Sequence, residues 1–277
     1  MAVVVKSTAP SPPPPSFPSS SPSFQFHRIS VDVPRRLGHG LCPPIAVACP
    51  SPPPRTLDKS ALKVAEAAAA SEDQLWAAAC LRIRSFYDFQ PTLGIEDHKR
   101  YLAEREFEAL KERVAGKRTG FKRVSCISAT LPLSHVANVF DDLCSACKFA
   151  ENGEDRVVVG TLDLNQCPWL PDEITGMKPQ GIGADFARAY LSNVCVAKEL
   201  QRNGLGCMLI AKSKEIAEDW GISDLYVHVA VDNEPAKKLY MKSGFIYESE
   251  EPAWQARFLD RPRRILLWTE IPNTLDL

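Results

Sequence analysis

A glycine-bearing turn at residues 201–206 (QRNGLG) constrains the fold of this chain more than any other segment. The apolar stretch before it, residues 188–196, is typical of a buried strand. The helix expected after it has an apolar side formed by Leu205, Leu209, Ile216 and Trp220. The first amides of a helix lack partners within the helix, and the helix dipole adds positive charge there. A strand that passes through Gly204 and Gly206 into a helix therefore predicts a site for phosphate or pyrophosphate.

Two common phosphate motifs do not fit this turn. A P-loop needs lysine and then serine or threonine after its second glycine, where this chain has Cys207 and Met208. A dinucleotide fingerprint needs a third glycine, where Leu209 stands. The sequence therefore excludes both a P-loop and a dinucleotide-binding fingerprint at this turn.

The surrounding segments predict one mixed α/β domain. We expect helices at residues 95–116, after the turn and at 233–244. We expect strands late in 73–89, through Leu81, Ile83 and Phe86, and at 121–131, 155–167, 188–196, 224–231, 245–251 and 263–271, with a long loop at 167–187. This order favours a mixed, mostly antiparallel twisted sheet flanked by helices.

Residues 1–57 differ in composition from the rest. They hold 14 of the 23 prolines, nine serines, five Lys or Arg, and Asp32 as their one acidic residue. Such a segment buries too little apolar surface to fold, so we expect it to be disordered. Its composition and position indicate a chloroplast transit peptide, with a proline-rich linker as the alternative, and residues 58–277 are expected to form the domain.

The charge and cysteine content of the domain exclude several function classes. Residues 58–277 carry 28 basic and 33 acidic side chains, a net charge of −5, which argues against a nucleic-acid partner. No run of 18 apolar residues predicts a membrane span. The nine scattered cysteines suggest reduced thiols. Cys144 and Cys147 alone fall short of a zinc site and fit helix packing, so no metal is expected.

Two motifs in this order resemble the GNAT superfamily of acetyl-coenzyme A (acetyl-CoA) dependent N-acetyltransferases. The family's Q/R-x-x-G-x-G/A turn is met at residues 201–206. Its N-x-x-A-x-x-x-Y-x-x-x-G-F run is met by Asn233, Ala236, Tyr240, Gly244 and Phe245. The clear resemblance covers residues 187–271. It implies the GNAT fold, acetyl-CoA as co-substrate, and similarity to plant plastid members that act on protein N-termini and lysines.

The resemblance also implies which residues bind the cofactor. The pantetheine arm would lie along Val194, Cys195 and Val196. The pyrophosphate would lie over the turn, which comprises Gln201, Arg202, Asn203, Gly204, Leu205, Gly206 and Cys207. Asn233, with its neighbours Asp232 and Glu234, would approach the pantetheine, although Asn233 could simply cap a helix. Tyr240 would give a proton to the leaving thiolate, and its alternative is a core aromatic.

The general base is where this sequence departs from the family. Many members carry a glutamate on the strand before the turn, but residues 188–196 contain no carboxylate. His228 with Tyr190 resembles a pair in members that acetylate protein N-termini, and Asp163 is a second candidate. His228 could also be structural. As a base with its ordinary pKa of about 6.5, His228 would give the rate an acidic limb near that pH.

The sequence thus predicts direct acetyl transfer in the plastid stroma to protein N-terminal α-amines and lysine ε-amines, helped by a backbone amide near Val196. The alternatives are a small-molecule amine acceptor, such as an arylalkylamine or polyamine, and a non-catalytic CoA-binding regulator. The sequence does not indicate the oligomeric state.

Overall fold

The computed structural model describes residues 57, 59–67, 71–90, 93–118, 121–136, 141–166, 187–258 and 260–272. The predicted transit segment, residues 1–57, lies outside these residues apart from Leu57. The predicted long loop, residues 167–187, lies outside them apart from Ala187. No helix within the described ranges is long and apolar enough to cross a membrane.

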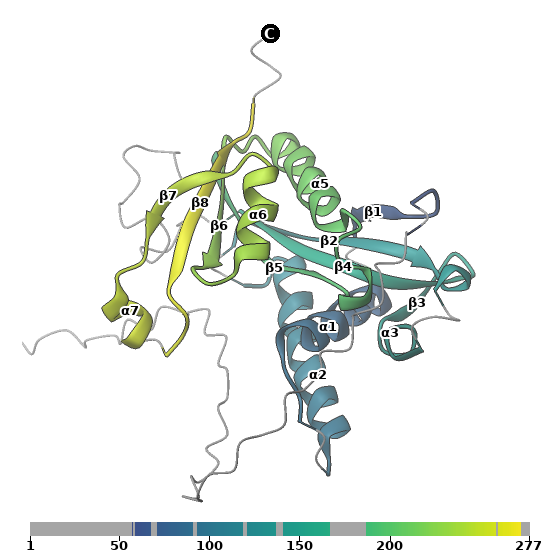
Figure 1. Ribbon diagram of the computed structural model, residues 1–277. Helices are drawn as coiled ribbons and strands as arrows, with labels where there is room; N and C mark the ends of the chain where they lie inside the picture. The colour runs from purple at the N-terminus through teal and green to yellow at the C-terminus, as the bar shows by residue number, and fades with distance from the viewer. Residues whose placement is uncertain are drawn as a thin grey trace, which may run out of the picture. The chain divides into compact units, whose positions relative to one another are not determined.

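One sheet of eight strands organises the described part of the chain (Figure 1). Its path runs through β1 (Lys63–Glu66), β2 (Arg123–Pro132), β4 (Glu154–Gln166), β5 (Arg188–Val196), β6 (Asp224–Ala230), β8 (Arg264–Glu270) and β7 (Ile246–Glu250), and β3 (Lys148–Glu151) pairs with β4. Neighbouring strands are antiparallel except β5 and β6, which are parallel. The predicted mixed, mostly antiparallel sheet is confirmed.

Helices cover both faces of this sheet (Figure 1). They are α1 (Glu72–Phe86), α2 (Ile95–Val114), α3 (Asp141–Ala146), α5 (Leu205–Asp219), α6 (Glu234–Lys242) and α7 (Ala253–Phe258), with 3₁₀ turns at Leu133–His135 and Lys198–Leu200. On β4, Gly160 faces Leu209 of α5, whereas Asp163 bonds Arg82 of α1. Alternate strand residues point to opposite faces, so α1 and α5 pack on opposite sides of β4.

The strand predicted within residues 73–89 is wrong, because this segment is helix α1. Leu81 and Ile83 alternate, but Arg82 between them is also buried, at 1% exposure. The helix packs against both α2 and the sheet, so its buried residues are not confined to one side and the helical period is hidden. Its run of alanines favours a helix, and this propensity decides the outcome.

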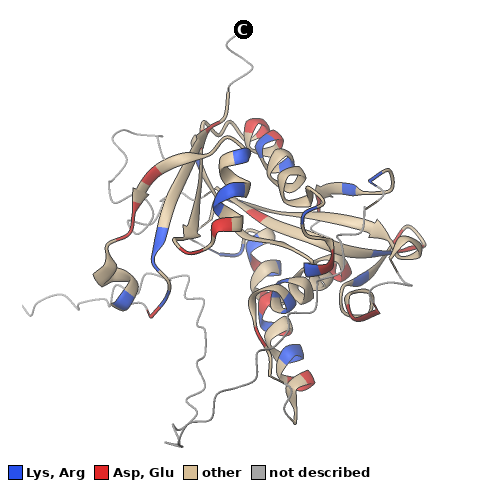
Figure 2. Ribbon diagram, viewed as in Figure 1, with Lys and Arg blue, Asp and Glu red and all other residues tan. Residues whose placement is uncertain are grey.

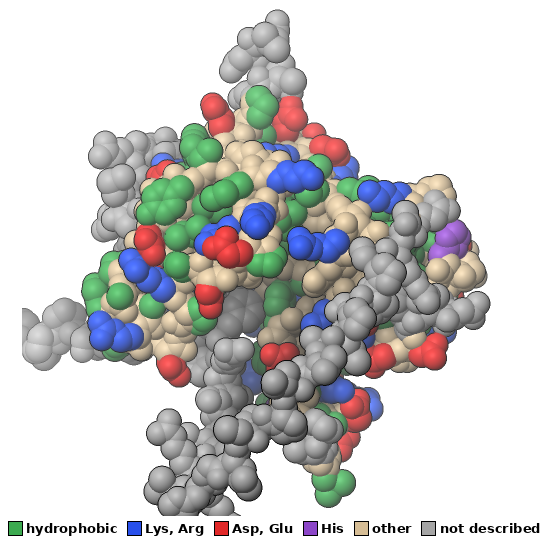
Figure 3. Space-filling model, viewed as in Figure 1, with side chains coloured by type: hydrophobic (Ala, Val, Ile, Leu, Met, Phe, Trp, Pro, Cys, Tyr) green, Lys and Arg blue, Asp and Glu red, His purple; other side chains and the backbone are tan. Residues whose placement is uncertain are grey.

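Figure 2 shows that basic and acidic residues alternate along the ribbons of α2 and α5. Several of them form ion pairs along one helix, such as Lys99 with Glu96 and Arg100 with Glu104. The edge strand β7 is exposed along its length, with Ile246 and Tyr247 each 55% exposed. Figure 3 shows hydrophobic side chains on the surface over this part of the sheet.

Candidate active site

The strands β5 and β6 separate in the middle of the sheet (Figure 1). Their parallel pairing ends at Leu191 and Val227, although β5 continues to Val196 and β6 to Ala230. The amide of Ala197 donates to Val159 of β4, so by the alternation of strand amides the N–H of Val196 points the other way, toward β6. The gap therefore presents backbone groups of β5 that lack a strand partner on this side.

A bulge in β5 lies at this point of separation. Asn193 has a φ of 54°, and the pairing register with β4 shifts between Thr161 and Asp163. The extra residue reorients the chain, so that Val194 and Val196 both pack against the main core. The strand that is predicted to lie along the pantetheine arm is thus a β-strand whose direction changes at the bulge.

The turn at residues 201–206 follows β5 and leads into α5. Gly204 has a φ of 83° and Arg202 a φ of 68°, so both take the left-handed conformation. Within the described residues, the amides from Arg202 to Cys207 have no hydrogen-bond acceptor. These amides lie at the positive end of a helix of 15 residues, which is where the sequence predicts an anion site.

The two glycines of the turn have different roles. A Cβ at Gly204 would meet only Lys59 Nζ, at 3.5 Å, so this glycine is required by its positive φ. A Cβ at Gly206 would lie 3.0 Å from Leu239 of α6. Gly206 therefore permits close packing of α5 on α6, a role that the sequence did not reveal.

Side chains of the turn hold its shape. Gln201 Nε2 donates to the carbonyl of Val196 at 3.3 Å. Asn203 Nδ2 lies 3.2 Å from the carbonyl of Leu200, and its Oδ1 accepts from the amide of Leu57 at 3.2 Å. Leu205 is buried, whereas Cys207 is partly exposed. The side chains of Gln201, Asn203 and Leu205 thus stabilise the turn, and its backbone amides from Arg202 onward remain unpaired within the described residues.

The start of α6 faces the same region from the end of β6. Asn233 Oδ1 accepts from the amide of Ala236 at 3.1 Å, so Asn233 is the N-cap of the helix. Asp232 O accepts from the amide of Glu234, whose side chain pairs with Lys237. Asn233 thus caps the helix, and its Nδ2 forms no hydrogen bond with a described residue.

Tyr240 of α6 is 5% exposed and packs edge-on against Phe245, with ring centroids 5.5 Å apart. Its hydroxyl makes no hydrogen bond within the described residues. Burial, and then the nearby Tyr190, raise the pKa of Tyr240. This phenol is therefore protonated at any physiological pH and can act as a proton donor.

Tyr190 of β5 and His228 of β6 form the predicted pair. The Tyr190 hydroxyl lies 3.1 Å from His228 Nδ1, and the two rings meet edge-on with centroids 5.8 Å apart. Both side chains are partly exposed, and the effect of Tyr190 on the pKa of Tyr240 places the three groups in one region. The pair spans β5 and β6 where their pairing ends.

The charge state of His228 differs from the ordinary one assumed from the sequence. Burial, followed by the positive charges of Arg264 and Arg261, lowers the pKa of His228 to about 3. The imidazole is neutral at physiological pH, so it can accept or donate a hydrogen bond but is a weak base. An acidic limb near pH 6.5 cannot come from His228.

Asp163 is held in a buried charge cluster. It is fully buried, and Arg82 of α1 bonds both of its oxygens at 2.6 and 3.0 Å. Arg113 of α2 lies 3.4 Å away, and Asn193 of the bulge donates to it at 2.8 Å. Although burial acts to raise it, the pKa of Asp163 is lowered by Arg82, Arg113 and these hydrogen bonds. The carboxylate therefore anchors the bulge and is excluded as the general base.

The cysteines do not add a nucleophile. The six in the described part are free thiols, and Cys144 of α3 and Cys147 just after it are buried. Burial raises the pKa of Cys195 to about 12. Among the described residues, no group of His, Cys, Asp and Glu could hold a metal ion.

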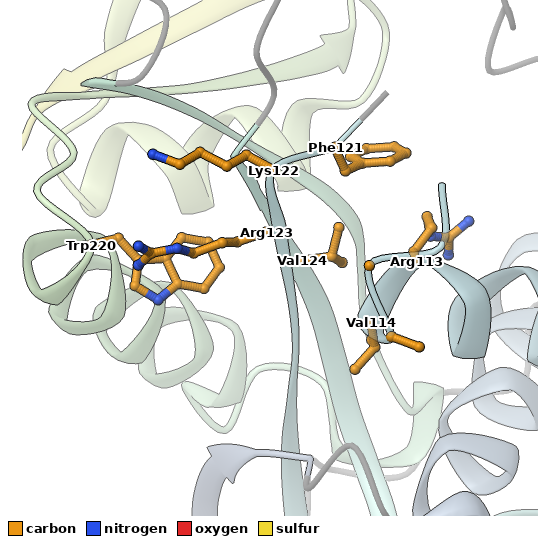
Figure 4. A pocket seen from close by; sticks show the side chains of 9 residues that line it. Arg113, Val114, Phe121, Lys122, Arg123, Val124 and Trp220 are labelled. Atoms are coloured by element: carbon orange, nitrogen blue, oxygen red, sulfur yellow. The ribbon is translucent and has the colours of Figure 1, made fainter. Parts of the chain in front are cut away.

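A separate pocket of about 320 Å³ lies at the C-terminal ends of α2 and α5 (Figure 4). The guanidinium of Arg123 lies 5.8 Å from the ring centre of Trp220 in its wall. The wall also includes Arg113, Val114, Phe121, Lys122 and Val124. Arg113, which lies beside Asp163, also lines this pocket, whereas Tyr190, His228 and Tyr240 do not, so the pocket is separate from the candidate active site.

Comparisons with known proteins show the family to which this chain belongs. The family model described as "Acetyltransferase (GNAT) family" matches residues 128–245. The Arabidopsis thaliana protein "GCN5-related N-acetyltransferase 7, chloroplastic" is 67% identical over 219 residues, which are 79% of each chain. The chain belongs to the GNAT family of acetyltransferases. It is therefore an N-acetyltransferase of the plant plastid group.

Two further similarities are weaker. "GCN5-related N-acetyltransferase 6, chloroplastic" from the same plant is 31% identical over 183 residues, 63% of this chain and 58% of that one. A solved structure of yncA from Salmonella typhimurium with its cofactor acetyl-CoA is 14% identical, with a TM-score of 0.40 over 76% of this chain and 94% of that chain. The latter likeness is too distant to support an argument. The chloroplast localisation predicted from the sequence is confirmed by the relatives' names.

Proposed function

We propose that this GNAT member transfers the acetyl group of acetyl-CoA directly to α-amines of protein N-termini and to ε-amines of lysines. The hydrogen-bonded Tyr190 and His228 pair is the observation that carries this proposal, since it occupies the position where the resemblance predicts acceptor-side residues of N-terminal acetyltransferases. Tyr240 lies in the same region and provides the proton donor. The presence of both Tyr240 and the Tyr190 and His228 pair favours an enzyme over a non-catalytic CoA-binding regulator.

Acetyl-CoA supplies the acetyl thioester and leaves as a thiol. The residues present fit it. The unpaired edge of Val194, Cys195 and Val196 matches the amide groups of a pantetheine arm, and the free amides of the turn suit the pyrophosphate. The Nδ2 of Asn233 forms no hydrogen bond with a described residue, so it can donate to the pantetheine arm. Asp232 and Glu234 are its neighbours in the chain. The N–H of Val196 points into the gap, where it would stabilise the charge that develops on the carbonyl oxygen.

The charge state of His228 and its hydrogen bond to Tyr190 support a route for the proton of the acceptor amine. His228 is neutral and Tyr190 is hydrogen-bonded to it, so the pair orients the acceptor and passes its proton onward through water, rather than storing the proton on the imidazole. The acceptor must then lose its proton mainly by its own acidity. An α-amine, with an ordinary pKa of about 7.7 to 8.0, reacts more readily at stromal pH than a lysine, with about 10.4. N-termini are thus the better substrates.

Mass spectrometry of acetylated products tests the substrate class. Purified protein is incubated with acetyl-CoA and peptides that carry a free N-terminus, a lysine, or both, and spermidine and an arylalkylamine serve as small-molecule acceptors. We expect acetylation of the α-amine first, then of lysine, with slower turnover of the small amines. Turnover of a small amine that exceeds all peptide turnover would overturn the proposal, and so would cofactor binding without any product.

A further inference from the structure

The segment before β1 lies against the turn that opens α5. The amide of Leu57 donates to Asn203 Oδ1 at 3.2 Å, although 146 positions separate the two residues. Leu57 and Leu62 both pack against the main core. Between them, the amide of Leu62 donates to the carbonyl of Lys59 at 3.2 Å, which closes a turn. These contacts hold Lys59 next to the turn at residues 201–206.

The ammonium group of Lys59 is close to the backbone of Gly204. Its Nζ lies 3.5 Å from the position that a Cβ on Gly204 would take. Lys59 forms no ion pair with any residue that the structure describes, whereas Lys63 of β1 bonds Glu151 at 2.8 Å. Arg202, in the turn itself, is exposed and also has no described ion-pair partner. Lys59 and Arg202, neither of which has a carboxylate partner among the described residues, therefore lie beside the free amides of the turn.

This combination suits a doubly charged anion. Free amides at a helix start bind one face of a phosphate, and flexible ammonium or guanidinium groups bind the remaining oxygens. A lysine that reaches the turn from a distant segment can close over a ligand after it binds, because its four-carbon side chain is mobile.

We propose that Lys59 binds the pyrophosphate of acetyl-CoA, so that Leu57 and residues 59–62 form part of the cofactor site. The proposal rests on the acetyl-CoA dependence stated above but not on the choice of acceptor. It also requires that any removal of a transit peptide leave Leu57 and Lys59 in place, since Leu57 fixes the segment to Asn203.

The test uses the full chain with Lys59→Ala, Lys59→Arg and Lys59→Glu, and Lys63→Ala as the matched control on β1. Calorimetry gives the Kd for acetyl-CoA and for its 3′-dephospho form. We expect Lys59→Ala to weaken both about five-fold, as for a solvent-exposed charge contact, and Lys59→Glu to weaken both further. Lys59→Arg and Lys63→Ala should stay near the wild-type Kd. Added salt should narrow the difference between wild type and Lys59→Ala.

Acetyl-pantetheine lacks the pyrophosphate, so it distinguishes the loss of a contact with that group from a general folding defect of the variant. Its kcat/KM in acetyl transfer should be the same for wild type and Lys59→Ala. An unchanged Kd for both CoA forms, a loss confined to the form with a 3′-phosphate, or an equal loss with acetyl-pantetheine would each overturn the proposal. If wild type binds acetyl-CoA but acetylates only small amines, the proposed acceptor class fails while the role of Lys59 stands.

Discussion

The neutral, partly buried state of His228 makes the stability of the protein sensitive to acid. The imidazole has a pKa of about 3 in the fold, against an ordinary value of about 6.5 in the unfolded chain. Between these values the unfolded chain binds a proton that the folded chain does not, so the free energy of unfolding falls as the pH decreases below about 6.5. Each pH unit in this window costs about 1.36 kcal/mol. At pH 5, His228 alone should therefore cost about 2 kcal/mol.

Urea unfolding of wild type and His228→Gln at pH 7 and pH 5 measures this contribution. Wild type should lose about 2 kcal/mol more than His228→Gln between the two pH values, because other titrating groups are common to both. His98→Gln, at an exposed position of α2, is the control and should lose as much as wild type. Equal losses in wild type and His228→Gln would refute the neutral, partly buried state of His228.

Other residues of the site give further expected outcomes. Tyr240→Phe should keep the Kd for acetyl-CoA measured by calorimetry and lower kcat about 10²-fold, because it removes only the proton donor. Asp163→Asn should lower the urea unfolding free energy by about 3 to 5 kcal/mol, because buried Arg82 loses its fully buried carboxylate partner and is left with the partly exposed Glu106. With an N-terminal peptide acceptor, the acidic limb of kcat/KM should lie near the pKa of the α-amine, about 7.7 to 8.0, and should persist in His228→Gln. Residues 1–60 fused to a fluorescent protein should enter plastids, as imaging and the size of the processed product would show.

The second half of the fold could be predicted closely from the sequence. The strand predicted at residues 188–196 matches β5, and the helix predicted after the turn matches α5, because both have apolar periods and Gly204 and Gly221 mark the ends of α5. The strands β1 and β3, of four residues each, and the helix α7, of six, were missed, since such short elements contain no more than two periods, whereas the helix expected at Cys144 corresponds to α3. The helix α1 was misassigned because contacts on several sides conceal its period.

The candidate site was predictable where motifs mark it and not where it depends on distant contacts. The pairing of Tyr190 with His228 followed from the resemblance, and the structure confirms their contact. The low pKa of His228 depends on burial and on Arg261 and Arg264, which no local pattern connects to it. The burial of Asp163 against Arg82 and the approach of Lys59 to the turn likewise join segments far apart in the chain.

The separation of β5 from β6 has a consequence for the lifetime of the protein. A ligand that fills this gap binds the folded chain and not the unfolded one, so it raises the free energy of unfolding by mass action. At a concentration of acetyl-CoA 100 times its Kd, the gain is about 2.7 kcal/mol, or about a 100-fold smaller unfolded population. Proteases degrade the unfolded population, so an acetyl-CoA shortage in the chloroplast would shorten the half-life of the enzyme along with its turnover. The abundance of the protein would thereby follow the supply of its own co-substrate.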